Sequence, residues 1–180
     1  MDRETIFHAY AVEAGAEDVE LRLMPLLKQE VFNGVYTGGF FKAPASSRFH
    51  GCYEGGLFDH HEAVYIKLKE LTEKLGFSWS LRSVFIVAFL HDMCKVDMYV
   101  KAGEGYSKNL TLSDTRHAEK SLDYIKQYIE LTEEEELCIR FHMGAYVKED
   151  WGAFAEAMHK YRTVLYTHTA DNDAANVQGT

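Results

Sequence analysis

The chain has 180 residues, 47% of them hydrophobic, and a formal net charge of −9. This length and apolar content predict a single domain over residues 1–180, with N-terminal helices in about 3–32 and a core of about 40–176. The acidic balance argues against binding to long nucleic acids or anionic membranes, but it leaves small anionic ligands open because a bound metal reverses the local field.

Three cysteines, Cys52, Cys94 and Cys138, form no CxxC pair, and their odd number suits a reducing compartment. We expect each to be a buried or half-buried small residue. The opening Met-Asp-Arg-Glu lacks the basic start and apolar block of a signal peptide. The longest apolar run is too short to cross a bilayer. These features predict a cytoplasmic location and no membrane partner.

Helical periodicity dominates the chain from its start. A helix or helix pair is predicted over about residues 3–32. A glycine- and aromatic-rich connection follows from Asn33 to Gly56, and loops of this length in a compact domain are often functional. The next helix is predicted from about Leu57 to Leu75, where Gly76 stops it.

Two adjacent histidines lie near the start of this helix. Leu57, Val64 and Leu68 belong to one apolar stripe, and His60 and His61 flank its beginning on opposite sides. Periodicity therefore does not decide which of the two faces inward.

A further helix, from about Ser80 to Cys94, contains the run Val84-Phe-Ile-Val-Ala-Phe-Leu90, which has almost no polar face. Such a helix is buried. His91 and Asp92 follow the run directly, and a buried carboxylate must be paired, hydrogen-bonded or bound to a metal. This pair is the most informative feature of the sequence.

The second half supplies more groups of the same kind. Residues 100–112 are expected to form a loop or a short hairpin. A helix over about 114–130, with Asp114 as its N-cap, places His117 on its apolar face. Thr132 to Glu135 is a capping-box pattern that opens a helix ending near His142.

The last predicted helix covers about 153–176. Its inward side is expected to carry Asp171, with Asp173 pointing away. No convincing strand is found, so the predicted fold class is all-α. The inward stripe of this helix comprises Tyr161, Val164, Leu165, His168, Asp171, Asn172 and Ala175.

Imidazoles and carboxylates together favour divalent transition metals such as manganese, iron, nickel, cobalt or zinc, and magnesium with added waters. His60, His91, Asp92 and Asp171 would make one site. His117 and His142 would hold a second ion if Asp92 bridges, and two such ions can clamp a phosphate and activate water. Each ligand histidine needs an acceptor for its other ring nitrogen, and the candidates close in sequence are Asp59, Glu62, Asp97 and Glu119.

Lys95 shares a helical face with His91 and Asp92. Beside a metal-bound phosphate it would neutralise negative charge, and Lys95 and Asp92 are therefore the candidate catalytic residues. The alternative is a surface lysine just past a helix end. His8 and His159 fit no such pattern and are expected at the surface.

The ordered motifs resemble those of the HD superfamily of metal-dependent phosphohydrolases over roughly residues 40–175, and the two middle histidines are similar to its two-metal branch. The resemblance favours His60 over His61. Two departures are Cys94, where the branch usually has glycine, and a single His142, where some branches have two histidines. The matching segments are Gly55-Gly-Leu-Phe-Asp-His60, Leu90-His-Asp-Met-Cys-Lys95, His117, His142 and His168-Thr-Ala-Asp171.

The resemblance implies an HD-type helical bundle and hydrolysis of a phosphoester or phosphoanhydride, with a small, nucleotide-like phosphorylated substrate. The segment Ala43-Pro-Ala-Ser-Ser-Arg-Phe-His50 is similar to the substrate-side loop of nuclease- and nucleotidase-like members. Arg48, His50, Lys95 and His168 are accordingly the predicted substrate contacts.

Two other functions stay open at this point. Some HD-fold enzymes hold an iron pair with the same six ligands and oxidise small polar substrates, so a di-iron oxygenase is the first alternative. A metal-stabilised binding module without turnover is the second. Exposed aromatic residues leave room for a homo-oligomer.

Overall fold

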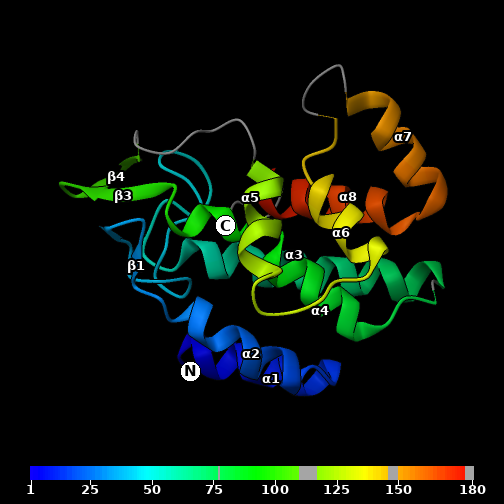
Figure 1. The fold of residues 1–180 in the computed structure, drawn as a ribbon, viewed down its shortest axis with the longest axis horizontal. Coiled ribbons are helices and arrows are strands. Elements are labelled where there is room, and N and C mark those ends of the chain that lie inside the picture. The colour runs from blue at the N-terminus through cyan, green and yellow to red at the C-terminus, as the bar shows by residue number, and fades with distance from the viewer. Residues whose placement is uncertain (77, 110–116, 146–149, 177–180) are drawn as a thin grey trace.

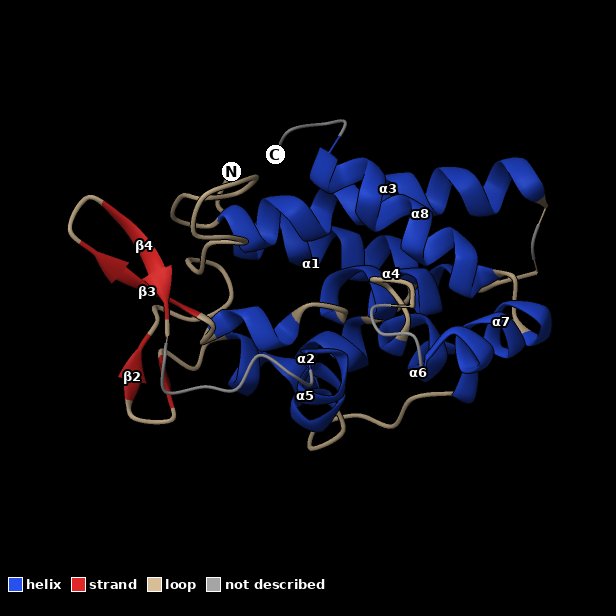
Figure 2. Ribbon diagram, turned by 90° about the horizontal axis from the view of Figure 1, so that it is seen from above, coloured by secondary structure: helices blue, strands red, loops and turns tan. Residues whose placement is uncertain are grey.

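The structure is a computed structural model, and it describes residues 1–76, 78–109, 117–145 and 150–176. Helices dominate these residues, and two small two-stranded sheets lie at one end (Figures 1 and 2). The mainly helical single-chain architecture confirms the helical prediction, but the expectation of no strands is wrong. No helix among the described residues has the length and apolar character needed to cross a membrane.

Eight α-helices and four short strands are described, together with one 3-10 turn, η1 (Met93–Val96). The helices are α1 (Arg3–Ala14), α2 (Glu17–Leu27), α3 (Gly56–Leu75), α4 (Leu81–Leu90), α5 (His117–Ile125), α6 (Glu133–Arg140), α7 (Trp151–Lys160) and α8 (Thr163–Asn176). The strands are β1 (Val31–Phe32), β2 (Val35–Tyr36), β3 (Tyr99–Ala102) and β4 (Gly105–Lys108).

The N-terminal pair α1 and α2 lies along one side of the bundle (Figure 1). Asp2 caps α1 by accepting the Thr5 N–H, and Gly15 ends it in the left-handed conformation. Phe7 packs its ring 5.0 Å from Phe85 and 5.1 Å from Phe89 of α4. The predicted helix pair is therefore confirmed as far as Leu27, whereas Val31 and Phe32 form β1 instead, and α1 covers α4 with the Phe7 ring.

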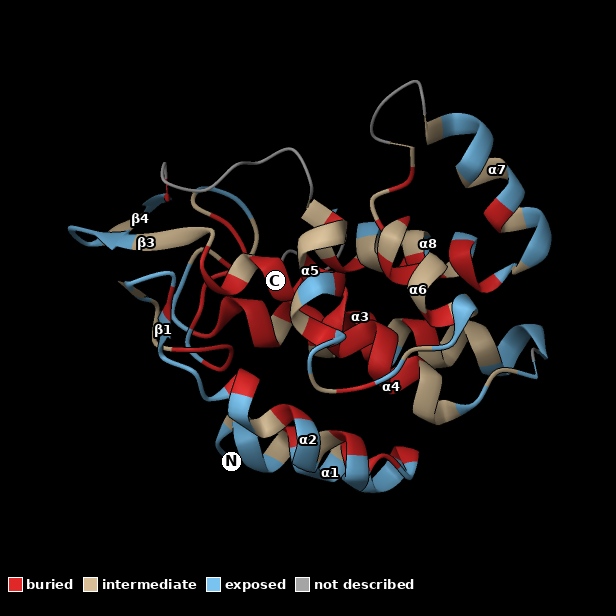
Figure 3. Cartoon of the chain, in the orientation of Figure 1, coloured by how far each residue is buried: buried red, intermediate tan, exposed pale blue. Residues whose placement is uncertain are grey.

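The centre of the molecule is α4, which α3, α6 and α1 contact. Every residue from Val84 to Leu90 is buried, as predicted (Figure 3). Burial of these apolar side chains is the main stabilising contribution at the centre of the fold. The expected end of α3 is also confirmed, because Gly76 adopts φ 65° and its N–H bonds to the carbonyl groups of Thr72 and Glu73.

The connection before α3 is held against that helix by a close backbone approach. A Cβ built on Gly56 would lie 2.1 Å from the carbonyl oxygen of Gly51, so only glycine fits there. The Ala45 N–H also donates to the Gly51 carbonyl. These contacts fix the segment with Arg48 and His50 beside the first turn of α3.

The predicted helix over 153–176 is two helices. Tyr161 is extended, with φ −134° and ψ 109°, and separates α7 from α8. The Tyr161 hydroxyl donates to Glu133, and the Thr163 hydroxyl donates to Glu134 at the start of α6. Side-chain contacts with α6 therefore hold a break that no proline or glycine marks.

The buried side of α8 also differs from the predicted stripe. Leu165 is 42% exposed and Asn172 is exposed. By contrast, Val164 is buried and Asp171 is half-buried. The helix begins at Thr163, ten residues later than expected, and its buried stripe is rotated toward Thr167 and Ala170. The buried residues of α8 are Thr163, Val164, Thr167, Ala170 and Ala174.

Two other local predictions can be followed in the structure. The Thr132–Glu135 capping box is present with both reciprocal hydrogen bonds. The loop or hairpin expected over 100–112 is the β3–β4 hairpin, and residues 110–112 lie outside the described part of the chain. Asp114, the predicted N-cap, also lies outside it.

Candidate metal centre

The cluster is built where α4 ends. His91 is the C-cap of α4, and its N–H still donates to the Val87 carbonyl. Asp92 then leaves the helical conformation, with φ −111° and ψ 26°, and η1 begins. Both side chains are buried, because the apolar helix carries them into the interior. α3 contacts both α4 and α8.

Four side chains from three elements meet there. His60 lies in the first turns of α3, and Asp171 lies in the middle of α8. The His60 Nε2 is 3.0 Å from Asp171 Oδ1 and 3.9 Å from Asp92 Oδ2. The His91 Nε2 is 3.5 Å from Asp171 Oδ1 and 3.6 Å from Asp92 Oδ2. The ligand atoms of all four lie within 4.8 Å of one another, so this group could hold a metal ion.

A second group shares Asp92. His117, the first residue of α5, places its Nε2 2.7 Å from Asp92 Oδ1. His142, just beyond α6, places its Nε2 3.3 Å from the same oxygen. These three ligand atoms also lie within 4.8 Å of one another. The two oxygens of Asp92 therefore face two different sets of histidines.

Backbone carbonyl groups orient two of these rings. The His91 Nδ1 bonds to the Ala88 carbonyl at 2.9 Å, and the His142 Nδ1 bonds to the Ile139 carbonyl at 2.7 Å. Nδ1 is then the protonated nitrogen of a neutral ring, and Nε2 keeps a free lone pair toward the cluster. The acids expected in this role pair elsewhere: Asp59 with Arg3, Glu62 with Tyr10, Asp97 with Lys120 and Glu119 with Arg140.

The buried nitrogens fit a divalent cation. The Nε2 atoms of His60, His91 and His142 are buried and make no hydrogen bond of normal geometry. An unpaired buried polar atom is costly, and a metal ion would satisfy it. Imidazole nitrogens and carboxylate oxygens suit manganese, iron, cobalt, nickel and zinc.

The charges of the cluster are set by neighbouring groups. Burial alone would raise the pKa of Asp92, but Lys95, His142 and His117 hold it well below its usual value. Burial lowers the pKa of His60 to about 4, against the opposing effect of Asp171. Anionic carboxylates beside a neutral imidazole are the protonation states that metal coordination requires.

In Asp171 and His142, too, neighbouring groups shift the pKa against the effect of burial. Burial would raise the pKa of Asp171, but the neighbouring imidazoles of His60 and His91 lower it well below its usual value. Burial would lower the pKa of His142, but the adjacent Asp92 raises it.

Lys95 points into the site and is no surface lysine. Its Nζ lies 2.6 Å from Asp92 Oδ2, with a side chain that is 13% exposed. Burial would lower the Lys95 pKa, but Asp92 and Asp171 raise it, so the ammonium stays charged. Cys94, the residue before Lys95, is buried, and its backbone N–H donates to the Ser121 hydroxyl.

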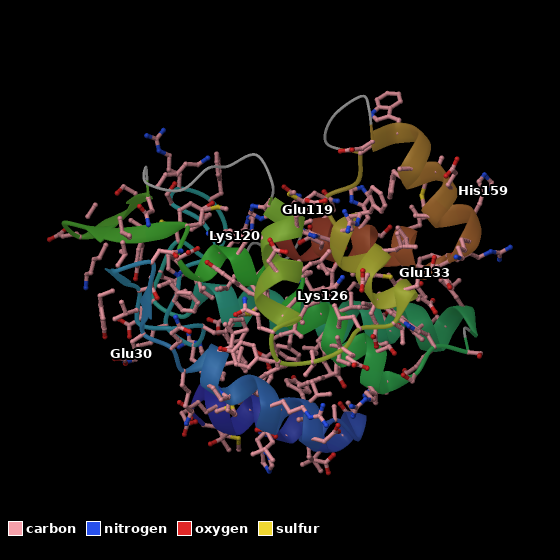
Figure 4. The ribbon with its side chains drawn as sticks, viewed as in Figure 1. Glu30, Glu119, Lys120, Lys126, Glu133 and His159 are labelled. Carbon is pink, nitrogen blue, oxygen red and sulfur yellow. The ribbon has the colours of Figure 1, made fainter. Side chains whose placement is uncertain are left out.

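His61 is the buried histidine that stands outside both groups. Its Nδ1 bonds to the Phe89 carbonyl at 2.8 Å, and its ring packs 5.2 Å from Phe40. The group that could hold a metal contains His60, its neighbour along α3. His8 is exposed as expected, and so is His159, which lies on the outer side of α7 (Figure 4).

Of the predicted substrate residues, His50 lies beside the cluster, Arg48 lies at the surface and His168 contacts the backbone of His142. The His50 ring lies 5.1 Å from the His60 ring, and its buried Nε2 has no hydrogen-bond partner. Arg48 is exposed on the same segment. The His168 Nδ1 bonds to the His142 carbonyl at 2.7 Å, so His168 supports the backbone of a candidate ligand.

A pocket that the sequence did not reveal adjoins His50. It encloses about 770 Å³ and is open to solvent. Ala175, one of its lining residues, lies one helical turn after Asp171, so the pocket reaches the neighbourhood of the cluster. Its lining comprises Phe49, His50, Gly51, Cys52, Tyr53, Ala175 and Asn176.

No known family model, curated protein or solved structure matches the chain. The resemblance to the HD superfamily is thus unconfirmed. A mainly helical fold with a buried His/Asp cluster that could hold a metal ion stands on the geometry alone.

Proposed function

We propose that this chain is a metal-dependent phosphohydrolase that cleaves a phosphoester or phosphoanhydride of a nucleotide-like substrate with a metal-activated water. One observation carries the proposal. Asp92 presents Oδ2 toward His60 and His91 and Oδ1 toward His117 and His142. A carboxylate placed between two histidine sets is the arrangement required to bridge two ions.

The residues divide into two proposed ligand sets. His60, His91 and Asp171 would hold one ion, His117 and His142 would hold the other, and Asp92 would belong to both. Such ions supply Lewis acidity toward phosphate and a bound water that ionises near neutral pH. The ordered motifs that resemble the HD superfamily support the same assignment, and with it an HD-type bundle.

Lys95 and His50 support phosphate as the reacting group. The Lys95 ammonium is a fixed positive charge inside the cluster, where it would stabilise charge that develops on phosphate oxygens. The unpartnered Nε2 of His50 is a polar atom available to a substrate beside His60. Arg48 lies two residues away on the exposed side and would meet the substrate from solvent.

The test is release of phosphate or nucleoside from a panel of nucleotides by protein loaded in turn with manganese, iron, cobalt, nickel, zinc or magnesium. Asp171→Asn is expected to lose activity and metal. Asp173→Asn is its matched control, because Asp173 lies on the same helix but pairs with Lys67 at 3.4 Å. Equal activity in the two variants would contradict the ligand assignment.

The same experiment separates the two alternatives. Oxygen consumption by the iron-loaded protein, without phosphate release, would indicate a di-iron oxygenase. Full metal occupancy without turnover of any substrate would indicate a binding module.

A further inference from the structure

The second group of candidate ligands depends on how α5 and α6 lie relative to each other. His117 begins α5, and His142 lies two residues after the end of α6. The centroids of the two rings are 6.0 Å apart, and both Nε2 atoms face Asp92 Oδ1. Metal–nitrogen bonds have a narrow range of lengths, so the spacing of the two helix ends decides how well one ion can bind both rings.

An ion pair joins the two helices beside these histidines. The Arg140 Nη1 lies 2.6 Å from the Glu119 Oε1. Glu119 is in the first turn of α5, two residues after His117. Arg140 is in the last turn of α6, two residues before His142. Each charge also lies at the helix end whose dipole stabilises it, so the pair ties the ligand-bearing end of α5 to that of α6.

The contact of α5 with η1 is separate from this pair. The buried Ser121 hydroxyl accepts the Cys94 N–H at 3.0 Å, one helical turn after His117. This bond places α5 against the segment that follows Asp92. It does not involve α6, so the position of His142 relative to His117 depends in addition on the contacts between α5 and α6.

A second ion pair joins the same two helices away from the ligands. The Lys126 Nζ, just beyond the end of α5, lies 2.7 Å from the Glu136 Oε1 of α6. Figure 4 shows Glu119 and Lys126 toward opposite ends of α5. The four side chains of the two pairs are 30–43% exposed. The two pairs therefore differ mainly in their distance from the candidate ligands.

We propose that Glu119 and Arg140 are positioning residues for the second metal ion, which act through His117 and His142 without contacting the ion. The inference rests on the proposed function, from which it takes the second ligand set. It assigns a role in metal affinity to one of two similar ion pairs between the same helices.

An effect on position differs in sign from an effect of charge alone. Loss of a negative charge near a cation weakens its binding, whereas loss of a positive charge strengthens it. Loss of either Glu119 or Arg140 breaks the same contact. If the pair acts through position, both losses therefore weaken binding of the second ion.

The test is a cobalt(II) titration of the metal-free full chain, followed by the visible absorption of cobalt bound to imidazole. Glu119→Gln and Arg140→Gln are each expected to raise the dissociation constant of the second ion about threefold, with the first unchanged. The double variant should be weakened no further, because either substitution alone already breaks the pair.

Lys126→Gln is the matched control, because it breaks the other pair between the same helices. Both of its dissociation constants should equal those of the wild type. Tighter binding of the second ion by Arg140→Gln, or equal weakening in Lys126→Gln, would overturn the inference. Unchanged cobalt binding with slower phosphate release in Arg140→Gln would also overturn it and assign Arg140 to the substrate.

The inference and the proposed function fail in different ways. Binding of a second ion that is independent of the Glu119–Arg140 pair removes the positioning role and leaves the phosphohydrolase. Two ions whose affinity depends on the pair, in a chain that releases no phosphate, remove the phosphohydrolase and leave the positioning role.

Discussion

Two aspartates five residues apart, Asp92 and Asp97, are both buried, yet their surroundings differ. Asp97 accepts from the Lys120 Nζ at 2.6 Å, the Tyr124 hydroxyl at 2.7 Å and the Asn33 side chain at 2.9 Å. Its donors come from α5, which carries Lys120 (Figure 4), and from the β1–β2 turn. The protein itself satisfies this carboxylate.

Asp92 lies instead among the Nε2 atoms of His60, His91 and His142, which are buried without a hydrogen-bond partner. Lys95 and His117 contact it at 2.6 and 2.7 Å, while His60, His91 and His142 lie at 3.3 to 3.9 Å. Burial of an acid is therefore no sign of function by itself. The distinguishing feature is a set of neighbouring polar atoms that lack protein partners.

The largest expected effect is the loss of turnover in Asp92→Ala. Because Asp92 belongs to both ligand groups, its removal should lower the rate of phosphate release by at least about a thousandfold. Initial rates on the best nucleotide of the panel measure this effect. A variant that keeps more than about a tenth of the rate would place the reaction elsewhere.

Asp97→Ala is expected to have the opposite effect to Asp92→Ala, with a loss of stability and no loss of metal. Removal of this carboxylate leaves Lys120 and Tyr124 without their partner, and it should reduce the free energy of unfolding by about 3–5 kcal/mol. Metal content per folded chain should not change. Urea unfolding monitored by circular dichroism gives the stability, and loss of metal from folded Asp97→Ala would remove the distinction between the two sites.

Lys95→Ala tests the charge inside the cluster. Turnover should fall by about a hundredfold with metal content unchanged, because the lysine acts on developing charge and is no metal ligand. Lys126→Ala, which removes a surface pair with Glu136, is the control and should keep its rate. Metal loss in Lys95→Ala would mean that the lysine holds the ligands in place.

The smallest expected effect is a pH dependence of the free energy of unfolding of the metal-free protein. Burial lowers the pKa values of His60, to about 4, and of His61, against an ordinary value of 6.5. Below pH 6.5 the unfolded chain binds these protons and the folded chain does not. Stability should therefore fall between pH 6.5 and about 4, by about 1.4 kcal/mol per pH unit for each proton.

Other groups contribute outside this window. The raised pKa of His142 gives stability that is complete below pH 6.5 and is lost as pH rises through the folded-state value. The lowered pKa values of Asp92 and Asp171 give stability that is lost only at more acidic pH. Urea unfolding in chelator should show a slope smaller by one proton in His61→Phe, and an unchanged slope would assign the effect to other groups.

The cluster was predictable because its main signal is local. An apolar run that ends in His91-Asp92 forces an acid into the interior, and the structure brings the other predicted ligands to it. Helical periodicity could not distinguish His60 from His61 as the candidate ligand, because both side chains are buried. The acceptors for His91 and His142 were missed because they are carbonyl groups three residues earlier, whose position depends on where each helix ends.

The fold was predictable where the chain carries caps, as at Gly76 and Thr132. The β1–β2 hairpin was missed although Asn33-Gly34, with φ values of 50° and 77°, is a strong turn signal between two apolar pairs. The break at Tyr161 has no local signal. Its cause is tertiary, because Tyr161 and Thr163 bond to the first turn of α6.

Elemental analysis of the freshly purified protein tests the central claim most directly. The account predicts two transition-metal ions per wild-type chain, one in His117→Ala and none in Asp92→Ala, with Asp97→Asn equal to wild type. A wild-type protein that binds no divalent ion at saturation, or an Asp92→Ala protein that binds as many as wild type, would contradict it.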